Sequence, residues 1–386
     1  MYDELLQWLP RDRLITDSGE LRVYECDGLP LHKHAPIAVA LCASRDDVVH
    51  CVRWCREKGI PFVPRGAGTG LSGGASPVTQ SLILDLGRMR SIRQVDFENR
   101  YAVVEPGVIN LHLSDAICCD GFHYAPDPSS QRACTIGGNV AENSGGPHCL
   151  KYGMTADHVL GLEVVLPDGE VLRLGGPETD RPGPDLCGLF IGTEGTFGVV
   201  TEITVRLVPN PQEVRTFLAI YESMRMACRT VAELTRLGVS PAALEILDQR
   251  TIEAVEASVY AAGYPKDAAA VLLIELDGFS ASMDDDEDVI RQVAESCEVL
   301  DFRVARDADE RKKLWMGRKG AFGAMGRVNT DLYVLDGVVP RTKLEETLEK
   351  VYAIAENRRV TLSNVFHAGD GNLHPNISYD GRDPDE

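Results

Sequence analysis

The feature that most constrains this chain is a glycine-rich stretch, Pro64–Pro77, with the sequence PRGAGTGLSGGASP. Five of its glycines lie within nine residues. Glycine tolerates positive φ, so successive backbone N–H groups can converge on one anion with no side chain in the way. Apolar runs at Ile60–Val63 and Leu82–Leu84 predict buried strands on either side. A loop held in this way predicts a cradle for an anion such as a pyrophosphate, rather than an ordinary surface loop.

The same stretch contains a dinucleotide-binding pattern. Gly68–Gly73 spells G-x-G-x-x-G, and Asp85 follows at a spacing similar to that of the acidic residue in the Rossmann motif. That motif requires a helix to begin within it. Here Gly74 and Pro77 follow, and then a strand. We therefore reject a nicotinamide site of the Rossmann type and expect no helix in this loop.

The composition excludes several classes of protein. The length of 386 residues predicts two or three domains, and the net charge of −20 argues against a nucleic-acid surface. The 11 cysteines include no C-x-x-C and no iron–sulfur ligand spacing, so we expect free thiols in a reducing cytoplasm. Met1–Pro10 does not resemble a signal peptide, and no apolar run approaches the length of a membrane span.

The first half of the chain alternates strands, helices and loops of small residues. Ile37–Leu41 predicts a strand, and Ser44 predicts the N-cap of a helix that ends at Gly59. Leu162–Leu174 predicts a hairpin. The tract Tyr124–Gly146 is rich in Gly, Ser, Thr and Asn, which suits a chain lying flat against a polar, planar ligand. The alternative for this tract is a long structureless connection.

The second half predicts a separate domain. Pro209 and Pro211 mark the boundary, after which strand and helix patterns alternate. We expect an α+β domain with its helices on one side of a sheet. The expected strands are 216–221, 243–247, 271–276, 328–335 and 361–366, and the expected helices are 223–236, 249–262, 284–297, 308–325 and 341–357.

An arginine lies on the apolar stripe of one expected helix. Leu314, Phe322 and Met325 are neighbours of Arg318 at helical spacings. A guanidinium in apolar surroundings needs an anion. Arg318 therefore either pairs with a nearby Asp or Glu, reaches water along its stem, or binds the carboxylate of a substrate with its two-pronged end.

Two histidines flank a turn near the end of the sequence. Asp370-Gly371 lies between two alternating runs and predicts a two-residue hairpin turn. In that register His367 lies opposite His374, with Cβ atoms roughly 5 Å apart. Two neutral imidazoles so placed can share one divalent metal, Zn, Mn or Fe, although a third ligand has to come from elsewhere. The alternative is an ordinary hairpin with two surface histidines.

Five motifs together resemble the FAD-linked oxidases of the vanillyl-alcohol oxidase/PCMH superfamily, in particular the branch of the glycolate oxidase flavoproteins and the D-lactate dehydrogenases. The motifs are PRGAGTGLSGG, DPSSQRACTIGGNVAENSGG, GTEGTFGVVTEI, WMGRKGAFGAMGR and FHAGDGNLHPN, in the order of the family. The resemblance implies an α+β fold in three parts. These are an N-terminal lead-in at 1–32, a PCMH-type FAD-binding domain at 33–211, and a ferredoxin-like α+β cap domain for the substrate at 212–386.

The resemblance also implies the site residues. Thr69 stands where relatives with a covalent flavin have a histidine, so FAD is expected to be bound non-covalently. Arg318 matches the arginine for the substrate carboxylate. His367 and His374 match two metal ligands, and Asn376 falls near the same site. The residues implied to bind FAD are Pro64, Arg65, Gly66, Ala67, Gly68, Thr69, Gly70, Leu71, Ser72, Gly73, Pro126, Asp127, Ser129, Cys134, Thr135, Gly137, Gly138, Asn139, Asn143, Gly145, Gly146, Glu194, Gly198, Val199 and Ile203.

The function implied is the oxidation of a small D-2-hydroxy acid, glycolate or D-lactate, to the 2-oxo acid by hydride transfer to flavin. Such a chain is expected to be the catalytic flavin subunit of a glycolate oxidase. Its electrons would pass to a second flavin subunit, an iron–sulfur subunit or a quinone. We expect it in the cytoplasm, or held at the inner membrane by these partners.

Two alternatives remain. The family continues to a segment resembling Gly-Glu-His-Gly that supplies a third metal ligand and a general base. This sequence ends at Glu386 without that segment, so a truncated chain that binds FAD without catalytic competence is one alternative. A flavin reductase that uses NADPH is the other, and the paired histidines and Arg318 argue against it.

Overall fold

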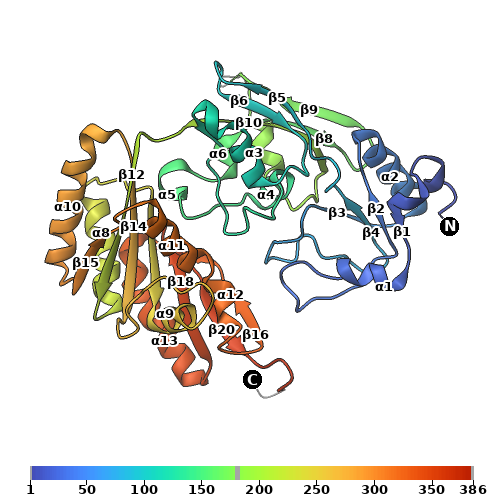
Figure 1. Cartoon of the computed structure of the whole chain (residues 1–386). Helices are drawn as coiled ribbons and strands as arrows, with labels where there is room; N and C mark the ends of the chain where they lie inside the picture. The colour runs from blue at the N-terminus through green and yellow to red at the C-terminus, as the bar shows by residue number, and fades with distance from the viewer. Residues whose placement is uncertain (1, 179–182, 384–386) are drawn as a thin grey trace. The chain divides into compact units, whose positions relative to one another are not determined.

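The computed structural model of the chain describes residues 2–178 and 183–383, which form two compact units (Figure 1). Unit 1 consists of Met1–Gly146 and Gly153–Asn210, and unit 2 consists of Pro147–Tyr152 and Pro211–Glu386. A short segment from the middle of the chain, Pro147–Tyr152, thus packs with the second unit. It carries helix α5 (Cys149–Tyr152).

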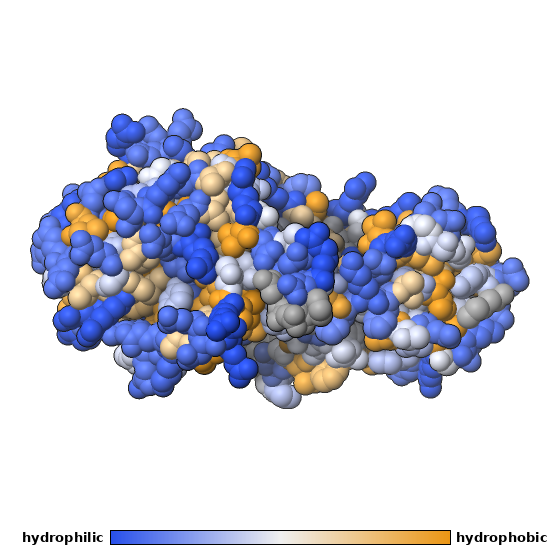
Figure 2. Space-filling model, turned by 90° about the horizontal axis from the view of Figure 1, so that it is seen from below, coloured by the Kyte–Doolittle hydropathy of each residue, from blue (hydrophilic) through white to orange (hydrophobic). Residues whose placement is uncertain are grey.

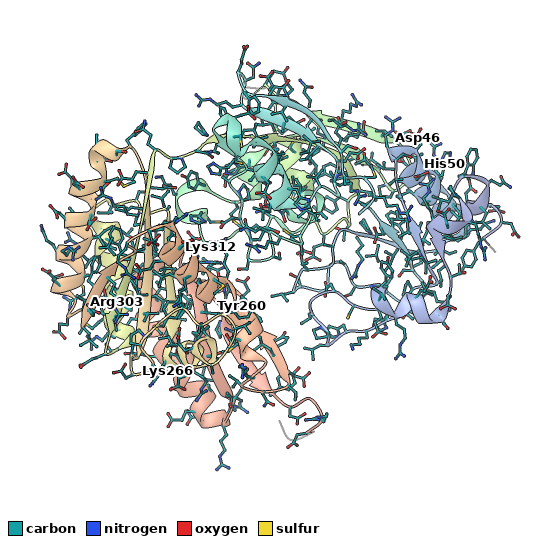
Figure 3. All side chains as sticks on the ribbon, viewed as in Figure 1. Asp46, His50, Tyr260, Lys266, Arg303 and Lys312 are labelled. Atoms are coloured by element: carbon teal, nitrogen blue, oxygen red, sulfur yellow. The ribbon has the colours of Figure 1, made fainter. Side chains whose placement is uncertain are left out.

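The first sheet of unit 1 carries the glycine-rich loop. Its strand order is β1-β2-β4-β3, and both β2 and β3 run parallel to β4. Helix α2, on which Figure 3 labels Asp46 and His50, packs its apolar side against this sheet. As expected, the Ser44 hydroxyl accepts a hydrogen bond from the Asp47 N–H, and Gly59 ends the helix with a φ of 66°. The bounds are β1 Leu14–Ile15, α1 Ser18–Leu21, β2 Ala38–Leu41, α2 Arg45–Lys58, β3 Phe62–Arg65 and β4 Leu82–Asp85.

The second sheet of unit 1 is antiparallel, with the order β5-β6-β10-β8-β9. Helices α3, α4 and α7 share one apolar core with it. The expected hairpin is confirmed as β8 and β9, in which Val165 pairs with Val171. The bounds are β5 Ile92–Asp96, β6 Tyr101–Val104, α3 Asn110–Ile117, β7 Phe122–His123, α4 Ile136–Glu142, α6 Thr155–His158, β8 Val159–Val165, β9 Val171–Gly175, α7 Leu186–Phe190, β10 Val199–Arg206 and β11 Val208–Pro209.

The two small-residue tracts differ in structure. Residues 66–81 form a loop between β3 and β4, so the prediction that no helix begins there is confirmed. The alternative for the second tract, a long structureless connection, is wrong because the tract contains α4. The Thr135 hydroxyl caps α4 by accepting from the Gly138 N–H, and Asn143 ends it with a φ of 48°. These two end signals outweigh the low helix propensity of the glycines inside.

Unit 2 is built on an antiparallel sheet with the order β15-β12-β14-β13-β18-β19-β17, and β20 joins β16 to it beside β18. Helices α8, α10 and α13 belong to one apolar core, while α9, α11 and α12 belong to another. The expectation of helices on one side of the sheet is therefore wrong. Leu272 and Leu273, which are neighbours in β14, lie in different cores, so both faces of the sheet are apolar and need cover.

The elements of unit 2 otherwise follow the expected order. The bounds are β12 Glu213–Tyr221, α8 Met224–Arg236, β13 Ala243–Asp248, α9 Gln249–Glu256, β14 Ala270–Gly278, α10 Met283–Ser296, β15 Asp301–Val304, α11 Ala308–Lys319, α12 Ala321–Met325, β16 Asp331–Val334, β17 Gly337–Val338, α13 Leu344–Arg358, β18 Thr361–His367, β19 Asn372–Leu373 and β20 Pro375–Tyr379. Short 3-10 helices lie at Leu5–Gln7, Arg11–Arg13, Arg22–Tyr24, Cys118–Asp120, Ser280–Ser282 and Arg341–Lys343.

Two expected helices of unit 2 end early. The expected helix 308–325 is split at Gly320 into α11 and α12, where a Cβ would lie 2.3 Å from Cγ of Tyr260. Tyr260, labelled in Figure 3, belongs to the segment after α9. The second of these expected helices, 249–262, ends at Glu256 as α9. The Glu256 carboxylate accepts hydrogen bonds from the N–H groups of residues 262–264 and holds the chain in a turn.

No helix within the described ranges is long and apolar enough to cross a membrane. On the face shown in Figure 2, apolar residues are interspersed among hydrophilic ones. All 11 cysteines are free thiols, as expected.

Candidate functional site

The glycine-rich loop of unit 1 packs directly on the start of α4. A Cβ added to Gly66 would lie 2.4 Å from the hydroxyl oxygen of Thr135. Side chains here would therefore push the loop away from the helix. Within the described ranges, the N–H groups of residues 67–69 donate to no backbone acceptor. Such amides on a backbone that lacks bulky side chains suit the phosphates of a dinucleotide.

Arg65 fixes the conformation of the loop. Its Nη1 donates to the carbonyl oxygens of Cys26 at 2.9 Å and Ala75 at 3.0 Å. Gly68 has a φ of 66°, and a Cβ there would lie 2.3 Å from Nη2 of Arg65. Only glycine satisfies both the backbone conformation and the close approach. The positive charge of Arg65 thus lies beside the loop, where it would compensate the charge of a pyrophosphate.

A cavity of about 440 Å³ lies at the first residues of the loop. Gly66, Thr135 and the turn at residues 107–109 are among its lining residues. Gly107 lets this turn lie close to the backbone of Leu86, since a Cβ on Gly107 would lie 2.4 Å from the Leu86 carbonyl oxygen. The volume lies in the range of cofactor sites, so the residues present fit part of an FAD molecule. The turn at 107–109 was not among the predicted site residues, although Pro106-Gly107 is a visible turn signal.

Carboxylates lie on the other side of the loop. A Cβ on Gly74 would lie 2.8 Å from Glu142 Oε1 and 3.0 Å from Glu194 Cδ. Burial, followed by the charges of Glu194 and Asp27, raises the pKa of Glu142 to about 6. Glu142 was also not predicted, and it places a titratable group next to the glycines proposed to hold phosphates.

The structure places the other residues predicted to bind FAD in several environments. Gly146 approaches Asp127 so closely that a Cβ would lie 2.4 Å from the Asp127 carbonyl oxygen. Asn139 is buried in α4, and its Nδ2 has no hydrogen-bond partner in the described part of the chain. Val199 and Ile203 are fully buried in the apolar cores of unit 1, so their side chains serve packing.

Glu245, Arg318 and His367 form a buried cluster in unit 2. Glu245 Oε2 accepts from Arg318 Nε at 2.6 Å, and Oε1 lies 2.8 Å from His367 Nδ1. The side chains of Glu245 and Arg318 are 0% exposed. Burial by itself would raise the pKa of Glu245, but Arg318 and His367 outweigh it and lower that pKa. The structural ion pair expected as one alternative for Arg318 is therefore present, although Nη1 has no partner among the described residues.

His374 lies beside this cluster. Its ring centroid is 5.0 Å from that of His367, and its Nδ1 lies 3.2 Å from the Val365 carbonyl oxygen. A carbonyl oxygen only accepts, so Nδ1 of His374 carries the hydrogen and Nε2 keeps a lone pair. Burial, followed by the charge of His367, lowers the pKa of His374 to about 4. The ring is therefore neutral at physiological pH.

The predicted register of the hairpin is wrong. His367 pairs with Asn372 and not with His374. The turn spans residues 368–371 instead of two residues, with the Asp370 N–H donating to the His367 carbonyl oxygen at 3.2 Å. The two imidazoles still meet, because the chain after the turn folds back along β18 and brings His374 to Val365.

These residues meet the needs of a metal in part. Imidazole nitrogens are suitable ligands for Zn, Mn or Fe, and Asp336 Oδ2 lies 3.8 Å from Nε2 of His374. Asn376 is fully buried, and neither its Oδ1 nor its Nδ2 has a partner in the described structure. Alternation along the chain puts Asn376 on the same side as His374. Within the described residues, 2–178 and 183–383, no group of three or more His, Cys, Asp or Glu side chains is placed to hold a metal.

Glu245 is the residue of this cluster that sequence patterns did not reveal. The signal was a carboxylate between two apolar residues, Leu244 and Ile246, inside an expected strand. A buried charge in such a strand needs a partner, and Arg318 needed one too. The same signal marks Glu275, at the centre of β14.

The chain is similar to known flavoproteins over almost its whole length. Residues 36–175 match the FAD binding domain family, and residues 210–386 match the C-terminal domain of FAD linked oxidases. The chain is 43% identical over 382 residues to glycolate oxidase subunit GlcD of Escherichia coli (strain K12), covering 99% of this chain and 76% of that protein. It is 33% identical over 351 residues to D-lactate dehydrogenase of Anaerostipes hadrus, covering 89% and 73%.

Solved structures show the same fold. A p-cresol methylhydroxylase with substrate bound has a TM-score of 0.82 at 20% identity, covering 99% of this chain and 83% of that one. An alkyldihydroxyacetonephosphate synthase has a TM-score of 0.79 at 18% identity, covering 98% and 80%. Together with the two family matches, these folds confirm the predicted class, a PCMH-type FAD-binding domain followed by an α+β domain. With the 43% identity over 99% of its length, the chain belongs to the family of FAD-linked oxidases and is an FAD-dependent oxidoreductase.

Proposed function

We propose that the chain oxidises a small D-2-hydroxy acid, glycolate or D-lactate, to the corresponding 2-oxo acid. Bound FAD would supply the hydride acceptor for the hydrogen on C2. The relatives named as a glycolate oxidase subunit and a D-lactate dehydrogenase support a CH–OH donor. The observation that carries the proposal is the buried Nη1 of Arg318, which has no partner among the described residues, in a cluster that also holds two imidazoles.

In this proposal Arg318 binds the carboxylate of the acid. Glu245 occupies Nε and Nη2, and Nη1 is buried without an acceptor in the described structure. An unsatisfied buried donor is costly, and a carboxylate oxygen would satisfy it with a charge-assisted hydrogen bond. Because Arg318 is 0% exposed, the side chains that cover it have to move when the acid binds.

In the same proposal, His367 and His374 would hold a divalent metal. Such a metal would supply Lewis-acid chemistry, which lowers the pKa of a bound hydroxyl. The lowered pKa of His374, about 4, keeps this ring available as a ligand at physiological pH. The Asn376 amide oxygen is a further candidate ligand on the same side of the sheet.

In this proposal, each of the two predicted domains binds one of the reactants. Residues 33–211 bind FAD, non-covalently since Thr69 replaces the histidine of covalent relatives, and residues 212–386 bind the acid. The loop 64–73, the tract 134–146 and the turn 192–198 line the cofactor. The contact of Gly66 with Thr135 and the cavity beside it support this assignment.

We also propose that the chain works as a subunit. The word subunit in the name of the relatives supports a complex. Electrons would pass from the flavin to a second flavin subunit, an iron–sulfur subunit or a quinone. The chain would then act in the cytoplasm, or at the inner membrane through its partners.

The test is anaerobic addition of acids to the FAD-loaded protein in the presence of Zn²⁺, Mn²⁺ or Fe²⁺. We expect glycolate or D-lactate to bleach the flavin absorption, and L-lactate to leave it unchanged. Arg318→Lys keeps the charge but loses the two-pronged geometry, so it should raise KM at unchanged flavin content. If no acid bleaches the fully loaded protein with any metal, the chain binds FAD without catalytic competence and the proposal fails.

A further inference from the structure

We propose that Glu245 is a positioning residue that sets the tautomer of His367 and the orientation of Arg318 at the same time. The inference rests on the proposed function for the roles of those two residues, and adds the group that holds them. Both oxygens of the buried Glu245 carboxylate are used. Oε2 accepts from Arg318 Nε at 2.6 Å, and His367 Nδ1 lies 2.8 Å from Oε1 and 2.9 Å from Oε2.

The contact with Glu245 determines which nitrogen of His367 carries the hydrogen. An ionised carboxylate only accepts, so Nδ1 must donate to it. Arg318 Nη2 lies 3.4 Å from the same Nδ1 and would favour the other tautomer by donating to it. The carboxylate oxygens are nearer, at 2.8 and 2.9 Å, so Glu245 is the stronger partner. In a neutral ring, a hydrogen on Nδ1 leaves a lone pair on Nε2, as a metal ligand must have. Glu245 and His367 are directly paired between β13 and β18, so the sheet fixes this contact.

The same carboxylate orients Arg318. It occupies the edge of the guanidinium formed by Nε and Nη2, through Oε2. Nη1 remains without a partner in the part of the chain that the structure describes. A second carboxylate can therefore approach Arg318 on the Nη1 side, and Glu245 decides which side that is.

A matched control lies on the neighbouring strand. Glu275 of β14 is 1% exposed and accepts from Arg311 Nε and Nη2, each at 2.9 Å. Arg311 and Arg318 lie about two turns apart on α11, so each pairs with one strand glutamate. Glu275 also accepts from Trp315 Nε1 at 2.5 Å and lies 3.0 Å from His148 Nε2. None of these partners belongs to the proposed site.

The experiment compares Glu245→Gln with Glu275→Gln in the full chain loaded with FAD. The first measurement needs neither metal nor turnover: ¹⁵N spectra of histidine-labelled protein, with the His367 signals assigned by His367→Asn. We expect Nδ1–H at His367 in the unchanged protein and in Glu275→Gln. In Glu245→Gln we expect a mixture of the two tautomers, because an amide can accept from Nδ1–H or donate to Nδ1.

The second measurement is Zn²⁺ affinity by competition with a chelator. Loss of a carboxylate behind a metal-ligating histidine typically weakens binding 10- to 100-fold, and we expect this for Glu245→Gln only. Equal losses in both variants would overturn the positioning role. An Nε2–H tautomer at His367 in the unchanged protein would overturn it without any variant. If the tautomer shifts in Glu245→Gln but the unchanged protein binds no Zn²⁺, Glu245 keeps its role and the metal of the proposed function fails.

Discussion

At the scale of single residues, one oxygen atom decides whether the glycine-rich loop tolerates a methyl group. In Gly66→Ala the Cβ would lie 2.4 Å from Thr135 Oγ1, whereas the next neighbours are 3.6 and 3.7 Å away. We expect this variant to bind FAD at least about tenfold more weakly, a change of about 1.4 kcal/mol. Adding Thr135→Ala removes the clash and should restore part of the affinity, although it removes an N-cap worth about 1 kcal/mol. Titration of the apoproteins by flavin fluorescence measures both, and equal affinities of the single and double variants would contradict the mechanism.

Glu142 should make FAD binding depend on pH. Its pKa is raised from an ordinary value of 4.5 to about 6, first by burial and then by Glu194 and Asp27. The folded state therefore holds the proton more tightly than the unfolded state, so this group's contribution to stability falls as pH rises from about 4.5 to 6. Bound phosphates would raise this pKa further, so FAD affinity should fall as pH rises above about 6. Glu142→Gln should remove this dependence and bind FAD more tightly above pH 6, as Kd values between pH 5 and 8 would show.

The control is Glu194→Gln, which should only move the pH at which FAD affinity falls to a lower value. If the Kd of Glu142→Gln changes with pH as steeply as that of the unchanged protein, the assignment to Glu142 is refuted.

At the scale of elements, the break between α11 and α12 depends on one glycine. A Cβ on Gly320 would lie 2.3 Å from Cγ of Tyr260, in the ring that packs against the break. We expect Gly320→Ala to lower the free energy of unfolding by about 1 to 3 kcal/mol, as overpacking does. Gly326→Ala is the control just beyond the same segment, since its Cβ would meet nothing closer than 3.7 Å. Urea unfolding of both variants gives the comparison, and equal effects would show that the Tyr260 contact is not the cause.

The elements also show what could be predicted from the sequence. Local signals succeeded, as in α2, where the serine cap and the terminal glycine lie next to the helix they bound. Signals that depend on distant contacts failed. The Asp370-Gly371 pair predicted a two-residue turn, but the packing of His374 on β18 belongs to a wider turn. Arg318 could be singled out from its helix, whereas its partner Glu245 comes from a strand 73 residues away in the sequence, and no local pattern joins the two.

At the scale of the whole molecule, the two units have separate apolar cores and should unfold in separate steps. The cores of unit 1 contain α2, α3 and α4, while those of unit 2 contain α8, α9 and α11. Chains with several domains commonly depart from two-state unfolding. The residues proposed to bind FAD lie in unit 1. A ligand at 100 times its Kd stabilises its binding unit by about 2.7 kcal/mol, so FAD should raise the Tm of one transition only.

Removing a buried charge in unit 2 should lower a Tm, whereas FAD should raise one. Glu275→Gln removes the carboxylate charge that Arg311 and His148 contact. Because the Arg311 side chain is 41% exposed, the expected cost is that of a hydrogen bond to a charged group, about 2 kcal/mol. His148 is part of the segment Pro147–Tyr152, which packs with unit 2 although its neighbours in sequence belong to unit 1. The variant should therefore lower the Tm of the transition that FAD leaves unchanged. Differential scanning calorimetry of the apoprotein, the FAD-loaded protein and the variant separates the two effects. If FAD and Glu275→Gln shift the same single transition, the three chain crossings between the units bind them into one cooperative structure.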